Sequence, residues 1–599
     1  MKTKSRNESL DALKGIAIIA VVLYHLGLFD YGYLGVDAFF VVSGYFTFRR
    51  FSTILSSESD EDRSQTRKVF DFLVQRINRL YPLIIAVCIF VLLIGFFVML
   101  PDDYESLCEA VFATIFGANN LLSRITVKDY WAISNEFKPL MHTWYLGVLT
   151  QFYIMVSFIA TIHIAVSRKK QRNIFLDIWT LLTIISFVFW VLPIGTNESK
   201  FYSSFYRFWE FGASIVLLDV YGKLNPKIVK TVSWTTILFS MYCVGGGVNN
   251  KVGVTLTVLS SIGIIETCHA EKSNRAIVNM ANKILAHFGI MSYSIYIWHE
   301  ALIVFYRYSI THTFRLFDFA ILLILCSVVG LISYLIFENK FFDKHTVSLL
   351  VTAGVIACFG LLGYLHAGVV RSVPELDIDF KSAVRGMNAA YNDRIYQYDH
   401  EFEHNNKNNV LIIGNSFARD FANCLLESSY GDSVNISYNV HLDDVRQRVA
   451  EADYIFVFGE KEVVSGNFEP LAVTFDKPIW LESTMKSSAE LWGIGNKNFG
   501  DNNGVVYAKR KDSEYYKTEV EIRSCFVRQN ELDKKYWKEH FVNFLDPVLN
   551  NTRSAVKVFT PTNRFISQDG YHLTRDGAIY YASVIDWNYI FRNSGGIVK

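Results

Sequence analysis

The chain has 599 residues, of which 51% are hydrophobic and only 19% are charged, and its formal net charge is +1. A charge so close to neutral argues against a protein that binds nucleic acid or another polyanion through bulk charge. The eight cysteines show no paired spacing, so neither a disulfide framework nor a cysteine zinc site is indicated. Apolar blocks gather before residue 370, which divides the chain into a hydrophobic part and a mixed part.

Apolar segments in the first part have the length, roughly 17–25 residues, that crosses a hydrocarbon core as a helix. We therefore predict a polytopic α-helical membrane domain of about 11 spans. The first segment is long and no small-residue cleavage site follows it, which favours a retained span over a signal peptide. The predicted spans are 10–28, 33–48, 81–100, 142–166, 175–194, 202–220, 232–248, 252–269, 286–306, 317–337 and 347–367.

Basic loops set the expected orientation of these spans. "MKTKSR" precedes the first span, "SRKKQR" follows the fourth and "KLNPKIVK" follows the sixth, whereas opposite loops such as "GTNESK" carry little positive charge. Because short basic loops stay in the cytoplasm, we expect the N-terminus inside the cell. An odd number of spans then puts residues 370–599 outside the cytoplasm.

Ionisable residues occur inside the predicted spans, where a buried charge is costly and usually functional. Lys14 and His25 share one face of the first span, about 16 Å apart along its axis. An interfacial lysine and a hydrogen-bonded buried histidine are the plainer interpretations of these two residues. Asp37 and Ser43 follow in "GYLGVDAFFVVSGYF", and Asp37 there needs a cation or hydrogen-bond donors.

Two arginines, Arg76 and Arg79, lie on one helix face where the third span enters the membrane, in "QRINRLYP". They could bind phosphate groups. Taken alone, the pair is explained more simply as ordinary cytoplasmic positive charge. Further candidates in the spans are His142, Trp144 and Gln151 in "MHTWYLGVLTQFY", and His299 and Glu300 in "SYSIYIWHEALIVF".

Together these motifs resemble the acyltransferase-3 family, integral-membrane enzymes that modify bacterial surface glycans. The family's basic residue, ten residues and histidine match Lys14 to His25, and its GxxGVDxFFVxSG pattern matches "GYLGVDAFFVVSG". Three further matches, in the family's order, are "RINRLYP", "HTWYLGVLTQFY" and "YSIYIWHEAL". The resemblance covers about residues 1–340, and five ordered motifs make it far more specific than any single one.

The resemblance implies an acyl donor, acetyl-CoA, that is met from the cytoplasmic side. His25 would act as an acid–base group or as a transient carrier of the acyl group. Arg76 and Arg79, with Lys14, would contact the CoA phosphates. Family members often have a glutamate where this chain has Leu149 or Thr150. An acidic role in that span is therefore in doubt, and Glu300 or Asp37 could supply the acid instead.

The second part of the chain alternates strand-like and helix-like segments after residue 405, which predicts an α/β domain with helices on a parallel sheet. Functional groups in such folds gather at the carboxyl ends of strands. Ser416 directly follows the strand-like "NVLII", in "IIGNSFARD", where a strand-to-helix turn can expose a nucleophile. Near the C-terminus, "SQDGYHLTRDGAIYYA" holds Asp569 and His572 three residues apart. An ordinary Asp-Gly turn before a helix explains that loop equally well.

"GNS" and "DGYH" resemble the first and last blocks of the SGNH hydrolases, a family with a three-layer α/β fold. The resemblance implies that Ser416 is the nucleophile, His572 the general base and Asp569 the residue that orients it. The family takes its oxyanion-hole donors from a glycine and an asparagine, whereas "FVFGEKE" offers Gly459 without the asparagine. Substitute amide donors in the Gly/Asn-rich "WGIGNKNFGDNNG" are Asn498 and Asn502.

The predicted function follows from both resemblances. The chain would be an O-acyltransferase of the bacterial cytoplasmic (inner) membrane that moves acetyl from acetyl-CoA to a surface polysaccharide or lipid-linked glycan, through an acyl-enzyme on Ser416. O-antigen lipopolysaccharide and capsule are candidate acceptors, membrane lipid surrounds the spans, and no metal or nucleic acid is expected. The predicted parts are 1–340 (acyltransferase-3 membrane domain), 341–370 (additional span), 371–405 (linker segment) and 406–599 (extracytoplasmic SGNH-like domain).

Two other classes of protein remain open at this point. A transporter of acyl or glycan intermediates would explain intramembrane His25 and Asp37, although not "GNS" together with "DGYH". An extracytoplasmic acetyl esterase would explain those two blocks, although not the membrane motifs. The sequence leaves the oligomeric state open.

Overall fold

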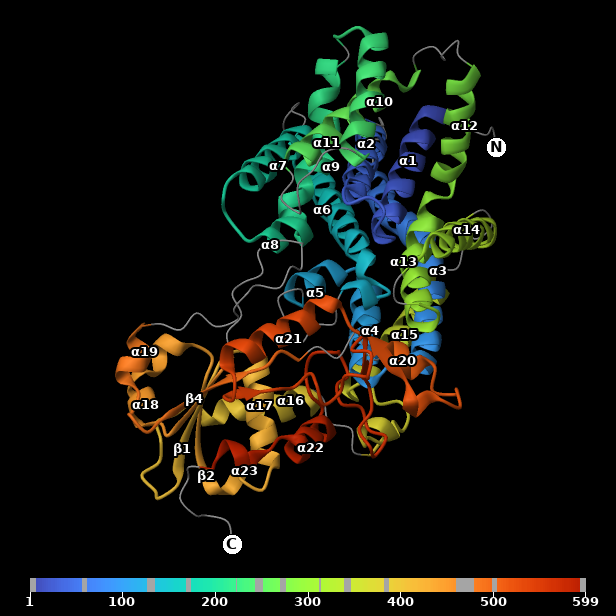
Figure 1. Cartoon of the computed structure of the whole chain (residues 1–599). Coiled ribbons are helices and arrows are strands. Elements are labelled where there is room, and N and C mark those ends of the chain that lie inside the picture. Colours follow the sequence, from blue (N-terminus) through green and yellow to red (C-terminus); the bar gives the residue numbers. More distant parts are fainter. Residues whose placement is uncertain are drawn as a thin grey trace. The chain divides into compact units, whose positions relative to one another are not determined.

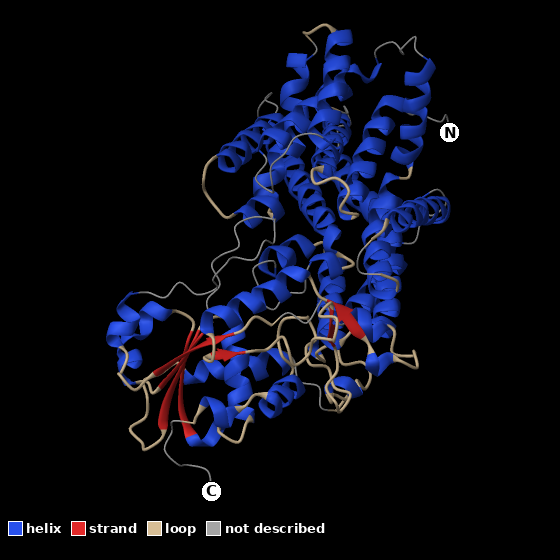
Figure 2. Cartoon of the chain, viewed as in Figure 1, coloured by secondary structure: helices blue, strands red, loops and turns tan. Residues whose placement is uncertain are grey.

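The computed structural model divides into two compact units (Figure 1). Met1–Phe96 and Ser106–Leu362 form the first unit, and Phe97–Glu105 and Gly363–Lys599 form the second. Figure 2 shows helices in the first unit and strands with helices in the second. The residues that the structure describes are 7–56, 62–126, 135–167, 174–221, 223–242, 251–269, 276–311, 314–338, 346–381, 387–458, 479–497 and 504–592.

Up to residue 365, the regular elements in the described part of the chain are helices joined by turns and short irregular segments. The longer ones are α1 (Glu8–His25), α2 (Gly35–Leu55), α3 (Asp62–Val98), α4 (Pro101–Ile115), α6 (Trp144–Ser167), α7 (Ile174–Val191), α9 (Ser204–Tyr221), α10 (Pro226–Tyr242), α11 (Lys251–Glu266), α12 (Ala276–Ile290), α13 (Ser292–Ser309), α14 (Leu316–Ser333) and α15 (Thr346–Leu365). Two short ones are α5 (Asn119–Thr126) and α8 (Asn197–Tyr202).

Every predicted span overlaps one of these helices, which confirms a helical domain with membrane-spanning character. By length and composition, five helices in the described part could cross a membrane, or six if the bent pair α12–α13 is one span. The count of eleven stays a prediction. The α10 and α11 helices have only 17 and 16 residues, and the first two turns of α1 hold Glu8, Asp11 and Lys14.

The α1 helix is held tightly against α12. Asn7 caps α1, because its side chain accepts the N–H groups of Ser9 and Leu10. A Cβ atom on Gly15 would lie 1.9 Å from the carbonyl oxygen of Leu285, so the two backbones approach as closely as glycine allows. Small residues at such contacts are typical of helix pairs in membranes. This packing fixes the direction of α1, which ends at His25.

The second unit is built on a parallel five-stranded sheet in the order β2-β1-β3-β4-β6, which confirms the predicted α/β class. The strands are β1 (Asn408–Ile413), β2 (Val434–Asn439), β3 (Tyr454–Val457), β4 (Glu490–Ile494) and β6 (Phe541–Val542). In this order the chain turns back between β1 and β3. Ligands of doubly wound sheets bind at the carboxyl ends of the strands beside such a switch point.

Helices cover both faces of this sheet. Val410 and Ile412 pack with residues of α17 (Ser416–Glu427) and α22 (Arg575–Val584). Leu411 and Ile413 pack instead with α18 (Arg446–Glu451) and α19 (Ile479–Thr484). Side chains of a strand alternate between the two faces, and both faces of β1 are apolar because both are buried.

The remaining elements are α16 (Met387–Asp393), α20 (Gly504–Ala508), α21 (Ser524–Trp537), α23 (Trp587–Ile590) and the antiparallel pair β5 (Glu519–Glu521) and β7 (Ala555–Lys557).

The segment expected to be a linker, 371–405, contains α16 and two short 3-10 helices. Ile395 belongs to the apolar core of the second unit. Asn392 is buried, and its amide donates a hydrogen bond of 3.1 Å to the carbonyl of Leu573. This segment therefore braces the chain next to His572. The predicted domain boundaries stay predictions.

Candidate functional site

The structure brings Asp569 and His572 into contact. The Asp569 carboxylate meets Nδ1 of His572 and accepts the backbone N–H groups of Tyr571 and His572, each at 2.8 Å. Partial burial raises the pKa of Asp569, but the His572 ring and these N–H donors outweigh it and hold that pKa well below its ordinary value. An ionised carboxylate at Nδ1 leaves Nε2 of His572 as the nitrogen that can accept a proton.

Ser416 is the first residue of α17, directly after the turn that leaves β1. Gly414 has a φ of +137°, and a Cβ there would lie 2.4 Å from the carbonyl oxygen of Phe458, so this turn requires glycine. Asn415 caps the helix through its side-chain oxygen, which accepts the Phe417 N–H. Asparagine and aspartate cap equally well, so an aspartate at this position would retain the same cap.

The hydroxyl of Ser416 is buried and has no hydrogen-bond partner among the described residues. It lies at the N-terminus of a helix, where the first backbone N–H groups have no intrahelical acceptor. One of these, on Phe417, is taken by Asn415. The others can stabilise a negative charge that develops beside the serine.

Two residues that the sequence did not single out connect Ser416 with the His572 loop. Asp420 lies four residues beyond Ser416 in α17, about 6 Å along the axis, and accepts the N–H of Leu573 at 2.9 Å. Lys497 pairs with Asp420 and donates to the carbonyl of Tyr571 at 3.0 Å. The helix that begins with Ser416 is thus bonded to the His572 loop, although the Ser416 hydroxyl itself makes no hydrogen bond to His572. Asn498, Asn502 and Gly459 lie outside the described residues.

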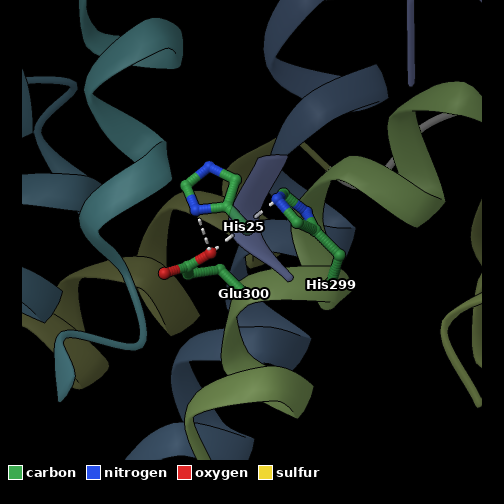
Figure 3. A group of neighbouring side chains, drawn as sticks. All are labelled: His25, His299 and Glu300. Carbon is green, nitrogen blue, oxygen red and sulfur yellow. Dashed lines mark ion pairs between the residues drawn. The ribbon is translucent and has the colours of Figure 1, made fainter. Parts of the chain in front are cut away.

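A second cluster lies at the C-terminal end of α1 (Figure 3). Nδ1 of His25 is 2.7 Å from Oε2 of Glu300, and the same oxygen is 3.9 Å from Nε2 of His299. Figure 3 shows His299 and Glu300 leaving neighbouring positions of α13, with the carboxylate reaching His25. This is the Asp569–His572 pattern again, a carboxylate at Nδ1 that leaves Nε2 of His25 to react.

His142 extends this cluster. Its ring centroid is 5.0 Å from that of His299, and among the described residues neither of its ring nitrogens has a hydrogen-bond partner. The donor atoms of His25, His299 and Glu300 lie within 4.8 Å of one another. Imidazole and carboxylate are zinc ligands, so this set could hold a divalent ion if the atoms closed to about 2.0–2.2 Å from it.

Asp37 has the cation that its buried position requires. Arg207 of α9 donates to the carboxylates of Asp37 and Glu210, all three being buried. The Arg207 guanidinium also lies 5.7 Å from the ring centre of Trp144. Arg207 and Glu210 were missed in the sequence, although two opposite charges three residues apart in the apolar "FYRFWEFGAS" are a usable signal.

The other predicted residues have surroundings of their own. Lys14 pairs with Asp11 at 2.9 Å. Because α1 is a continuous helix, Lys14 lies about 16 Å from His25 along its axis. Arg76 lies between the rings of Phe72 and Tyr153. The remaining three are Arg79, which is exposed on α3, Gln151, which pairs with Asn120 at 2.9 Å, and Ser43, which lies beside the Tyr145 hydroxyl.

Residues 7–338 match the family model described as the acyltransferase domain of acyltransferase-3 proteins. The chain belongs to the acyltransferase-3 family. It is 26% identical over 361 residues to the O-acetyltransferase OatA of Staphylococcus aureus strain NCTC 8325, a match that covers 56% of this chain and 57% of that protein. The OatA protein of strain COL matches equally well. The chain spans about half the length of these curated relatives. No solved structure matches it.

Membership assigns an acyltransferase domain to residues 7–338, and the five helices long and apolar enough to cross a membrane in the described part of the chain agree with a membrane protein. The matched part includes His25, Asp37, His142 and Glu300 and ends before Ser416. The acyltransferase-3 match therefore bears on the cluster around His25. The interpretation of the Ser416 site depends on its geometry, because the family match does not reach it.

Proposed function

We propose that this acyltransferase is an O-acetyltransferase that moves acetyl from acetyl-CoA to hydroxyl groups of a cell-surface polysaccharide. One observation carries the proposal. A chain with the acyltransferase-3 domain also contains an Asp569–His572 pair beside the helix that begins with Ser416. One part thus offers acyl-transfer chemistry and the other a nucleophile that can hold the acyl group. The similarity to the O-acetyltransferase OatA supports acetyl as that group.

The first step uses the cluster at the end of α1. Nε2 of His25 is the reacting atom, because Glu300 occupies Nδ1. His25 either carries the acetyl group or removes the proton of the group that accepts it. If His25 carries the acetyl group, its nitrogen attacks the thioester carbon, the carbon–sulfur bond breaks and CoA leaves as a thiolate. Glu300 then stabilises the positive charge on the ring.

Acetyl-CoA approaches from the side of the basic loops, which we assign to the cytoplasm. Arg76 and Arg79 share one face of α3 and, with Lys14, contact the CoA phosphates. The distance between Lys14 and His25, about 16 Å along α1, suits a slender pantetheine arm that carries the thioester to His25.

The second step uses the Ser416 site. The Ser416 oxygen attacks the carbonyl carbon of an acetyl donor and gives its proton to Nε2 of His572, while Asp569 holds Nδ1. The bond between the acetyl carbon and its donor breaks, and the departing donor group takes that proton from His572. The N–H groups at the start of α17 stabilise the oxyanion, with Asn498 and Asn502 as further candidate donors. A sugar hydroxyl then attacks the acetyl-serine, His572 takes the sugar proton, and Ser416 is released with a proton returned to it.

The acceptor follows from the expected location. With residues 370–599 outside the cytoplasm of a bacterial inner membrane, Ser416 meets glycans of the cell envelope or their lipid-linked precursors. The O-antigen of lipopolysaccharide and capsular polysaccharide are the acceptors proposed. The second unit of this chain resembles SGNH hydrolases in "GNS" and "DGYH", and its Ser416 exchanges acetyl with sugar in preference to water.

The test is the acetyl content of the surface glycan in cells that carry only a variant chain. Ser416→Ala and His25→Ala are each expected to lower that content to the level of cells without the gene. His441→Ala, an exposed histidine in the second unit, is the matched control and should leave it unchanged. Unchanged acetyl content in both test variants would rule out the transferase. A rise in Ser416→Ala would identify an esterase instead.

A further inference from the structure

We infer that Lys497 and Asp420 form a buried ion pair that positions Ser416 and His572 for reaction, an inference that rests on the proposed role of the serine. Both side chains are fully buried, and they contact each other. Neither belongs to the Ser416, His572 and Asp569 set. They are positioning residues, which act through the backbone around the reacting groups.

The pair holds the histidine from both sides along the chain. Lys497 donates to the carbonyl of Tyr571, the residue before His572, at 3.0 Å. Asp420 accepts the N–H of Leu573, the residue after His572, at 2.9 Å. His572 therefore lies on a short backbone segment whose two ends are bonded to one ion pair. The direction of its ring depends on that segment.

The same pair holds the serine. Asp420 and Ser416 are four residues apart in α17, so they lie on the same helix face. The ammonium group of Lys497 also lies 4.7 Å from the ring centre of Phe417, the residue after Ser416. That ring stacks on Phe458, which follows β3. Lys497 thus touches the first turn of α17 and the His572 loop at once.

The chemistry explains why an ion pair would serve here. Ser416 comes early in the second unit and His572 about 150 residues later, so no local chain geometry sets their separation. A nucleophile and its base must meet within hydrogen-bond reach, and a displacement of about 1 Å can cost roughly a hundredfold in rate. A buried ion pair that is bonded to both segments restricts how far Ser416 and His572 can move relative to each other.

The experiment measures how fast Ser416 reacts with a fluorophosphonate probe in the purified full-length protein, across a range of pH. Lys497→Met and Asp420→Asn are expected to slow labelling at least tenfold at fixed pH and to shift the pH at which the rate is half-maximal. Lys497→Arg retains the charge and should recover part of the rate. Asp420→Asn preserves the side-chain shape and an acceptor for Leu573, so it decides the result even if Lys497→Met does not fold.

Lys486→Met is the matched control. Lys486 pairs with Asp453, 2.9 Å apart, directly before β3, so its loss removes an ion pair at the end of the strands opposite to the serine. A purely structural role of Lys497 would lower the amount of protein that labels, as in this control, and leave the rate constant and its pH profile unchanged. That result for both Lys497→Met and Asp420→Asn would overturn the inference.

The outcome is separable from that of the proposed function. If glycan acetylation persists in Ser416→Ala cells, the acyl-enzyme proposal fails. Slowed labelling in Lys497→Met and Asp420→Asn would still support the positioning role. If acetylation depends on Ser416 and both variants label like wild type, only the positioning inference fails.

Discussion

Nδ1 of His25 lies 2.7 Å from Oε2 of Glu300, which joins the last residue of α1 to the middle of α13. The sequence pointed to both residues, to His25 as the reacting group and to Glu300 as a candidate acid. The structure shows what that glutamate contacts. A carboxylate in this position can orient the His25 ring and stabilise its imidazolium form.

Glu300→Gln is expected to retain the fold and lose most of the acyl transfer, by about 10²–10⁴-fold. An amide cannot stabilise a protonated ring and can favour the wrong tautomer of His25. The measurement is transfer of radiolabelled acetyl from acetyl-CoA into glycan by membranes that contain the variant. Glu266→Gln, at the exposed end of α11, is the control. Near-normal transfer by Glu300→Gln would remove Glu300 from the reaction.

Arg207→Met should be among the most damaging substitutions in the first unit. Arg207 pairs with two buried carboxylates, those of Asp37 and Glu210. Its removal leaves them uncompensated, which costs about 3–5 kcal/mol when a buried pair is broken. We expect little folded protein in detergent by size-exclusion chromatography and a lowered Tm in what remains. Arg50 is exposed on α2, and Arg50→Met should behave like wild type. Equal yield and Tm for the two variants would contradict this account.

Much of the fold could be predicted because its cause is local. Apolar runs of membrane length became helices, and alternating apolar and helix-like segments became a parallel sheet between helices. The Asp569–His572 contact was also predictable, since the two residues share one short loop.

Contacts between distant segments were not predictable. Lys497 and Asp420 are 77 residues apart, and Arg207 and Asp37 are 170 apart. Each residue alone is a common polar side chain, and only the packing shows that it is buried beside a partner of opposite charge. Lys497 also lies in the Gly/Asn-rich segment in which the sequence indicated Asn498 and Asn502, and not the lysine, as functional candidates.

Asn415→Asp is expected to preserve function, and Asn415→Ala to lower stability by about 1 kcal/mol. The reason is the cap on α17: asparagine and aspartate both accept the Phe417 N–H, and alanine cannot. The measurement is Tm together with the labelling rate of Ser416 by fluorophosphonate. Asn405→Ala, in an exposed turn before β1, controls for the loss of an amide side chain. If Asn415→Asp abolished labelling, Asn415 would have a chemical role beyond the cap.

Acid should weaken the second unit through Asp569. Its pKa is lower in the folded protein than in the unfolded chain, where an aspartate titrates near about 3.9. The ionised carboxylate therefore stabilises the fold above about pH 4, and this stabilisation is lost as pH falls toward the lower, folded pKa. In Asp569→Asn the contribution is absent at every pH. The Tm difference between wild type and Asp569→Asn should thus be largest above about pH 5 and shrink below about pH 4. The control is Asp586→Asn, introduced both into wild type and into Asp569→Asn. Asp586 caps α23 through its carboxylate, so the pH-dependent Tm difference between these two proteins should persist in the presence of Asp586→Asn. A Tm difference independent of pH would mean that the Asp569 carboxylate is not the group that titrates.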